Sequence, residues 1–194
     1  MPARTRLAKQ IRQVGVIFAL IFLGLLIAKA IAPADEPSYK LSNDNSAASQ
    51  EIATNAKLIG KQIAEVDMFD LNGQMISTAS YVGAPTIFNI WYSTCEPCRR
   101  ELPVLAETAK QFDGQVQFVG INIKDTKEVA KEFADRYGVE FATLLDTNGK
   151  FISALEIGTA PVTLAVDAQG KIVDQVAGEI SADRLNALVS ALLK

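Results

Sequence analysis

The hydrophobic and polar positions divide the chain into stretches of very different character. Residues 13–32 form an apolar run whose one charged residue is Lys29, and residues 33–59 are rich in Ala, Ser, Asn, Asp, Glu and Pro without an apolar period. From residue 60 onward, strand-like apolar runs alternate with segments of helical spacing. We therefore expect a basic N-terminus at 1–12, a transmembrane signal-anchor at 13–32, a flexible linker at 33–59 and one folded domain at 60–194.

Within the folded domain, we expect strands where a run is apolar and β-favouring, and helices where apolar residues recur every three or four positions. The expected strands cover 62–69, 74–77, 85–91, 116–122, 141–145, 162–166 and 172–176. The expected helices lie between Pro97 and Gly114, between Thr126 and Gly138, over 151–157, and after Ser181. The residues expected to face the core from the second and last of these helices are Val129, Phe133, Ala134, Tyr137, Leu185, Leu188, Val189, Leu192 and Leu193.

This order of elements predicts an α/β fold. The strand at 85–91, the helix after it and the strand at 116–122 form one β-α-β crossover, which is expected to be right-handed. The first two strands are joined through Asn72-Gly73, a pair typical of a type I′ hairpin turn.

The charges of the N-terminus predict its orientation in a membrane. Residues 1–12 hold four basic residues and no acidic one, whereas the rest of the chain has 15 basic and 22 acidic residues. Basic residues before an apolar span indicate a cytoplasmic N-terminus, so that everything after Ala32 is exported. The alternative is a cleaved signal peptide, because Ala28-Lys29-Ala30 and Ala30-Ile31-Ala32 resemble cleavage sites. Pro33 argues against cleavage at the second of these, and either alternative exports the domain to a compartment where disulfides persist.

The only two cysteines of the chain, Cys95 and Cys98, are spaced Cys-x-x-Cys at the expected turn from strand to helix. A helix N-terminus carries unpaired backbone N–H groups and a positive dipole end, which favour a thiolate over a thiol. The thiolate is the attacking species in disulfide exchange. We therefore expect Cys95 to attack and Cys98, one turn later, to resolve the mixed disulfide.

Two structural alternatives compete with this redox function. A zinc site needs four ligands, but the chain has no histidine and no further cysteine, so we expect no metal and no other cofactor. An inert buried pair of cysteines fits poorly with Glu96 and Pro97 between them and with Arg99-Arg100 after them. Two arginines on an acidic exported domain do not make a phosphate-binding track, so we expect no nucleic-acid binding.

Residues Phe88 to Glu101, with the tetrapeptide Cys-Glu-Pro-Cys, closely resemble the active-site segment of the TlpA/ResA-like membrane-anchored thioredoxins. The resemblance runs from about Gly60 to the C-terminus. It implies a thioredoxin-like fold, with a mixed central sheet flanked by helices, an N-terminal β-hairpin and the insertion typical of TlpA-like proteins. One departure is Thr94, which stands before the first cysteine where the family usually has Trp, although Trp91 remains.

The resemblance also implies roles for residues outside the cysteine pair. The segment from Gly158 to Thr163 looks like the one that carries the cis-proline facing the disulfide, so Pro161 is expected to shape the groove and Ala160 to present its backbone there. Glu101 matches a glutamate that lies beside the cysteines in the family. It is expected to assist proton movement, because Asn89 stands where ordinary thioredoxins have a buried Asp and cannot itself titrate. The alternative for Glu101 is an ordinary solvated glutamate near a helix N-terminus.

The resemblance further implies a direction and partners. It suggests reduction of disulfides in exported proteins, apocytochrome c among them, with electrons from a membrane thiol carrier. A disulfide-forming oxidase would use the same residues at a more oxidising potential. A peroxiredoxin-like peroxidase would need Pro-x-x-x-Thr/Ser-x-x-Cys, but Phe88 and Tyr92 occupy those positions. A redox-inert binding module on the same fold is opposed by the two intact cysteines.

Overall fold

In the computed structural model, which describes residue 22 and residues 55–194, every strand and helix expected between residues 60 and 194 has a counterpart. The elements are β1 (Asp67–Asp70), β2 (Met75–Ser77), the 3-10 helix η1 (Thr78–Tyr81), β3 (Thr86–Trp91), α2 (Glu96–Gln111), β4 (Gln117–Asn122), α3 (Lys127–Arg136), β5 (Ala142–Leu145), α4 (Lys150–Ala154), β6 (Val162–Val166), β7 (Ile172–Ala177) and α5 (Ala182–Leu192).

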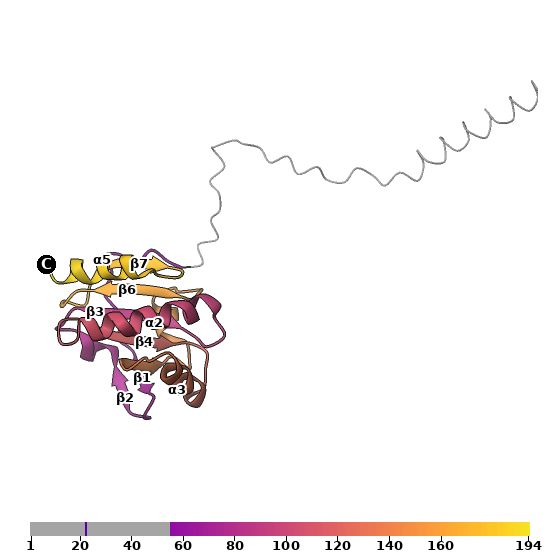
Figure 1. Ribbon diagram of the computed structural model, residues 1–194, viewed down its shortest axis with the longest axis horizontal. Coiled ribbons are helices and arrows are strands. Elements are labelled where there is room, and N and C mark those ends of the chain that lie inside the picture. Colours follow the sequence, from indigo (N-terminus) through magenta and orange to yellow (C-terminus); the bar gives the residue numbers. More distant parts are fainter. Residues whose placement is uncertain (1–21, 23–54) are drawn as a thin grey trace, which may run out of the picture. The chain divides into compact units, whose positions relative to one another are not determined.

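The strands form one mixed sheet in the order β2-β1-β5-β4-β3-β6-β7 (Figure 1). Strands β3, β4 and β5 are parallel, and β1 and β6 are antiparallel to their neighbours. Because parallel strands end at the same edge of a sheet, Trp91, Asn122 and Leu145 lie in register there. The segments that follow β3 and β4 therefore meet at one edge.

Alternate residues of the central strands pack on opposite faces of the sheet, as expected of strands buried on both sides. Helices α2, α3 and α5 cover the face that carries Ile87, Trp91 and Phe118. Helix α4 and residues near Leu58 cover the face that carries Phe88. Cys95 and Cys98 belong to the first of these two cores.

Two of the residues expected in the core are exposed, so these predictions were wrong. Val129 is 42% exposed and Leu193 is 43% exposed. Val129 lies in the first turn of α3, and Leu193 follows the last residue of α5. An apolar period continues through such positions, but a helix end can extend beyond the surface against which the helix packs.

The hairpin turn also differs from the prediction. Gly73 has φ +86°, but Asn72 does not have the positive φ that a type I′ turn requires. The backbone N–H of Asp70 instead donates to the carbonyl of Gln74, which closes a three-residue loop. One carboxylate oxygen of Asp70 accepts from the backbone N–H groups of Asn72 and Gln74 at 2.8 and 2.7 Å, and so stabilises this longer connection.

The folded domain includes residues that the sequence places in the linker. Asn55 forms an antiparallel bridge with Ile157, and Leu58 is fully buried. Further on, the N–H of Gly60 donates to the carbonyl of Ile172 at 2.8 Å, and the N–H of Ile63 donates to that of Gly170 at 2.8 Å. This segment therefore runs along the outer side of β7.

The predicted transmembrane segment at 13–32 falls outside the described residues, apart from Phe22. In the part of the chain that the structure describes, no helix combines the length and the apolar character needed to cross a bilayer.

Candidate active site

The cysteine pair lies at the junction of β3 and α2, as the spacing predicts. The N–H of Cys95 donates to the carbonyl of Tyr92 at 3.2 Å, and this turn makes Cys95 the N-cap of α2. Cys95 and Cys98 form a disulfide, and the backbone N–H of Cys98 donates to the sulfur of Cys95 at 3.2 Å. Cys95 is 4% exposed and Cys98 is fully buried. A negative charge on the Cys95 sulfur would therefore meet a helix N-terminus and an N–H donor, both of which favour a thiolate.

The turn before Cys95 is held by Asp125, a residue that the sequence analysis missed. The two carboxylate oxygens of Asp125 accept from the N–H and the hydroxyl of Ser93, both at 2.7 Å. Asn122, at the end of β4, donates its side-chain amide to the same carboxylate at 2.7 Å. The loop after β4 thus fixes the loop after β3 two residues before the Cys95 sulfur. A polar residue shortly after a parallel strand was the available signal, because parallel strands end at one edge.

The segment before β6 lies against the Cys95 sulfur, and its predicted cis peptide bond is confirmed between Ala160 and Pro161. The carbonyl oxygen of Ala160 is 3.8 Å from the sulfur of Cys95. The carbonyl of Pro161 accepts from the N–H of Gly178 at 2.8 Å. The structure therefore brings Ala160 and Pro161 to the cysteine pair across 65 residues of sequence.

Glu101 is buried, with 1% of its surface exposed, so the alternative of a solvated helix glutamate does not hold. One carboxylate oxygen accepts from the side-chain amide of Asn89 at 2.7 Å, and the other accepts from the N–H of Ile180 at 2.9 Å. Burial raises the pKa of Glu101 to about 7, although these two hydrogen bonds act to lower it. This carboxyl group can therefore bind or release a proton near neutral pH, one helical turn after Cys98.

The remaining predicted residues surround the pair in different ways. Trp91 is fully buried and stacks on Phe133 with ring centroids 5.8 Å apart. Pro97 is half-buried in the first turn of α2, and Glu96 is exposed there. Glu96 pairs with Arg99 at 3.4 Å and Arg100 at 3.6 Å. Arg100 also pairs with Glu179, so each arginine near the cysteines already has an anionic partner.

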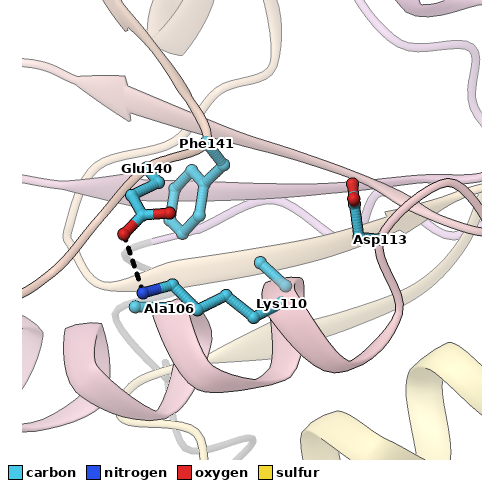
Figure 2. A pocket seen from close by; sticks show the side chains of 6 residues that line it. Ala106, Lys110, Asp113, Glu140 and Phe141 are labelled. Carbon is cyan, nitrogen blue, oxygen red and sulfur yellow. Dashed lines mark ion pairs between the residues drawn. The ribbon is translucent and has the colours of Figure 1, made fainter.

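A surface hollow near Phe141 is separate from this site. It is lined by residues of the second half of α2 and of the segments that follow α2 and α3, and the ion pair between Lys110 and Glu140, at 2.8 Å, crosses it (Figure 2). Cys95, Cys98, Glu101 and Pro161 are not among its lining residues. Within residue 22 and residues 55–194, no group of three or more His, Cys, Asp or Glu side chains is placed to hold a metal ion.

Comparisons with known proteins agree with this arrangement. Residues 59–175, which include both cysteines, match the AhpC/TSA family. The chain is 33% identical over 113 residues to the thiol–disulfide oxidoreductase ResA of Bacillus subtilis (strain 168), and the match covers 58% of this chain and 63% of that protein. ResA of Bacillus thuringiensis (strain Al Hakam) is 27% identical over 135 residues, covering 69% of this chain and 78% of that one. A solved structure of a secreted Mycobacterium tuberculosis disulfide oxidoreductase homologous to E. coli DsbE is similar with a TM-score of 0.62 and 26% identity, over 66% of this chain and 96% of the other.

Proposed function

The chain belongs to the AhpC/TSA family and is a ResA-like thiol–disulfide oxidoreductase, and we propose that it reduces disulfide bonds of exported proteins through Cys95 and Cys98. The observation that carries this proposal is the disulfide at the N-terminus of α2, with the N–H of Cys98 directed at the Cys95 sulfur. The buried carboxyl group of Glu101 supports it, because exchange must move protons as well as electrons.

In the reduced protein, the Cys95 thiolate attacks one sulfur of the substrate disulfide. The substrate S–S bond breaks, a bond between Cys95 and the substrate forms, and one substrate sulfur leaves as a thiolate that takes up a proton. The Cys98 thiolate then attacks the Cys95 sulfur and releases the second substrate sulfur. Two electrons have passed to the substrate, and the chain ends in the disulfide that the structure contains.

Cys98 must lose its proton before the second step. It is fully buried, and burial in apolar surroundings favours the thiol. We assign the proton acceptor to Glu101, whose pKa of about 7 suits transfer near neutral pH. Asn89, the polar side chain of β3 that contacts Glu101, cannot take a proton.

The direction of the reaction depends on the reduction potential of the pair. A value well below that of the substrate disulfides supports the reductase, and a strongly oxidising value supports the disulfide-forming oxidase. A peroxidase is disfavoured, since Phe88 is buried in the core and Tyr92 is half-buried at the positions where Pro and Thr/Ser would stand. The decisive measurement is the equilibrium of the Cys95–Cys98 pair against glutathione, together with turnover on a protein disulfide and on hydrogen peroxide.

We further propose that residues 13–32 anchor the chain in the membrane with the catalytic domain outside the cytoplasm. The support is the basic cluster that precedes an apolar run of nearly the required length. Apocytochrome c would then be one accessible substrate, and a membrane thiol carrier would return the electrons. A reporter that is active only after export, fused behind Lys194, should be active. An N-terminal sequence that starts at Ile31, Pro33 or Asp35 would overturn the anchor and leave export intact.

A further inference from the structure

The side chain of Asn55 binds the loop that precedes β6. Its Oδ1 accepts from the backbone N–H groups of Gly158 and Thr159 at 2.9 and 3.0 Å. Its Nδ2 donates to the hydroxyl of Thr159 at 2.9 Å. Three hydrogen bonds thus join Asn55 to a loop more than 100 residues later.

This loop is the one that faces the attacking sulfur. Thr159 is directly followed by Ala160, whose carbonyl oxygen lies 3.8 Å from the Cys95 sulfur. After Ala160, the carbonyl of Pro161 is bound by the N–H of Gly178. The backbone at Ala160 is therefore fixed on one side through Asn55 and on the other through Gly178.

The Asn55 bonds are not needed to hold the N-terminal segment itself. The side chain of Gln175 accepts from the N–H of Leu58 at 2.9 Å and donates to the carbonyl of Ala56 at 3.0 Å. The N–H of Ala56 donates to the carbonyl of Glu156, and Leu58 is fully buried. The segment is thus secured independently, whereas Gly158 and Thr159 are exposed residues whose backbone N–H groups Asn55 binds.

We propose that Asn55 is a positioning residue for disulfide exchange: it holds Gly158 and Thr159 so that the backbone at Ala160 is ready beside Cys95 for an extended segment of a protein substrate. The inference rests on the proposed function, because it assumes a polypeptide substrate. A small disulfide reaches the sulfur without pairing with this backbone, so the contribution of Asn55 is specific to protein substrates. The residue type fits, since one amide oxygen accepts two bonds and the amide nitrogen donates the third.

The test compares N55A, N55D and Q175A in the full chain. N55A should speed amide hydrogen exchange at Gly158 and Thr159 and lower kcat/KM for insulin reduction by about tenfold, since a small displacement at a reacting centre has a large effect on rate. The rate with the small disulfide 5,5′-dithiobis(2-nitrobenzoate) and the reduction potential should stay within about twofold of wild type. N55D keeps the acceptor and should restore most of the insulin activity, while Q175A should loosen residues 56–58 without changing kcat/KM.

Two results would overturn the inference. One is an unchanged kcat/KM for insulin in N55A. The other is an activity loss in N55A that is equal for insulin and for 5,5′-dithiobis(2-nitrobenzoate) and that Q175A also shows. Failure of the proposed function gives a different result, because the wild-type chain would then fail to reduce insulin.

Discussion

The side-chain amide of Asn89 donates a 2.7 Å hydrogen bond to the carboxylate of Glu101, although both residues are only 1% exposed. Asn89 also donates to the hydroxyl of Thr163 on the neighbouring strand β6, at 3.1 Å. The other oxygen of the carboxylate binds the N–H of Ile180, in the loop before α5. One titratable group therefore joins α2, the centre of the sheet and the last loop of the domain.

The first prediction concerns stability and pH. Glu101 has a pKa of about 7 in the folded protein, above the usual value near 4.5, because it is buried. Between these values the folded state binds more protons than the unfolded state, so stability falls as pH rises from about 4.5 to about 7. The free energy of unfolding should fall by about 3 kcal/mol over this range.

In E101Q this loss of free energy of unfolding should disappear, as measured by urea unfolding at pH 4.5 and pH 8. The variant E107Q, at an exposed position of the same helix, should follow the wild type. Parallel curves for E101Q and wild type would contradict the assignment.

The second prediction concerns the effect of Glu101 on the thiols. A carboxylate one turn from Cys98 repels a thiolate and takes up its proton, so the two titrations are coupled. E101Q should lower the pKa of the attacking thiol and slow turnover several-fold near pH 7. The pH dependence of thiol alkylation, measured beside insulin reduction, checks both effects. Wild-type values for both would leave Glu101 a structural residue.

The third prediction concerns the roles of the two cysteines. Cys95 is the N-cap whose sulfur meets the N–H of Cys98, and it is the less buried of the pair. C98S should accumulate a mixed disulfide with a protein substrate, joined through Cys95, and C95S should lose turnover entirely. Mass spectrometry of the trapped complex identifies the bonded cysteine, with the double variant as control. A complex trapped through Cys98 would reverse the roles.

The fourth prediction concerns the contact between Ser93 and Asp125. D125A removes both bonds to Ser93 and should destabilise the domain by about 2 kcal/mol, whereas S93A removes only the hydroxyl bond and should cost about 1 kcal/mol. Both variants should also change the alkylation rate of reduced Cys95, because the turn that places its sulfur loosens. D135A, at an exposed position of α3, is the control and should leave that rate unchanged. Equal alkylation rates in all three variants would show that Asp125 acts on stability alone.

The fifth prediction uses Trp91, the single tryptophan of the chain, as a reporter. A Cβ at Gly120 would lie 2.8 Å from the ring nitrogen of Trp91 and 3.1 Å from the hydroxyl of Thr143. G120A must displace the indole from its stacked position on Phe133, and should destabilise the domain by about 1–3 kcal/mol with a shifted fluorescence maximum. A double-mutant cycle with W91F should show that much of the destabilisation by G120A depends on the indole. Additive effects of G120A and W91F on the free energy of unfolding would show that the destabilisation does not come from the contact with the indole.

Some of these features could be predicted from sequence and some could not. Local signals indicated the Cys-x-x-Cys turn, because a buried strand, a helix cap and two cysteines stand within a few residues of each other. The resemblance located Pro161 and Glu101, but position alone could not distinguish a solvated glutamate from one that reaches Asn89. Asp125 and Asn55 were missed because their partners lie 32 and more than 100 residues away. The position of Asp125 shortly after a parallel strand was a signal of its contact, whereas nothing in the polar segment around Asn55 indicates its partners.

The segment from Asn55 to Ile63 also affects how the folded molecule meets other molecules. An uncovered edge strand is a template onto which a second chain can add, and so a starting point for aggregation. On the outer side of β7, the position that an added strand would occupy is filled by the chain's own residues from Ala56 to Ile63. At the opposite edge of the described sheet, β2 has only three residues. Folded molecules held close together should therefore resist edge-to-edge association. Deletion of the N-terminal residues through Ile63 should make them prone to this association.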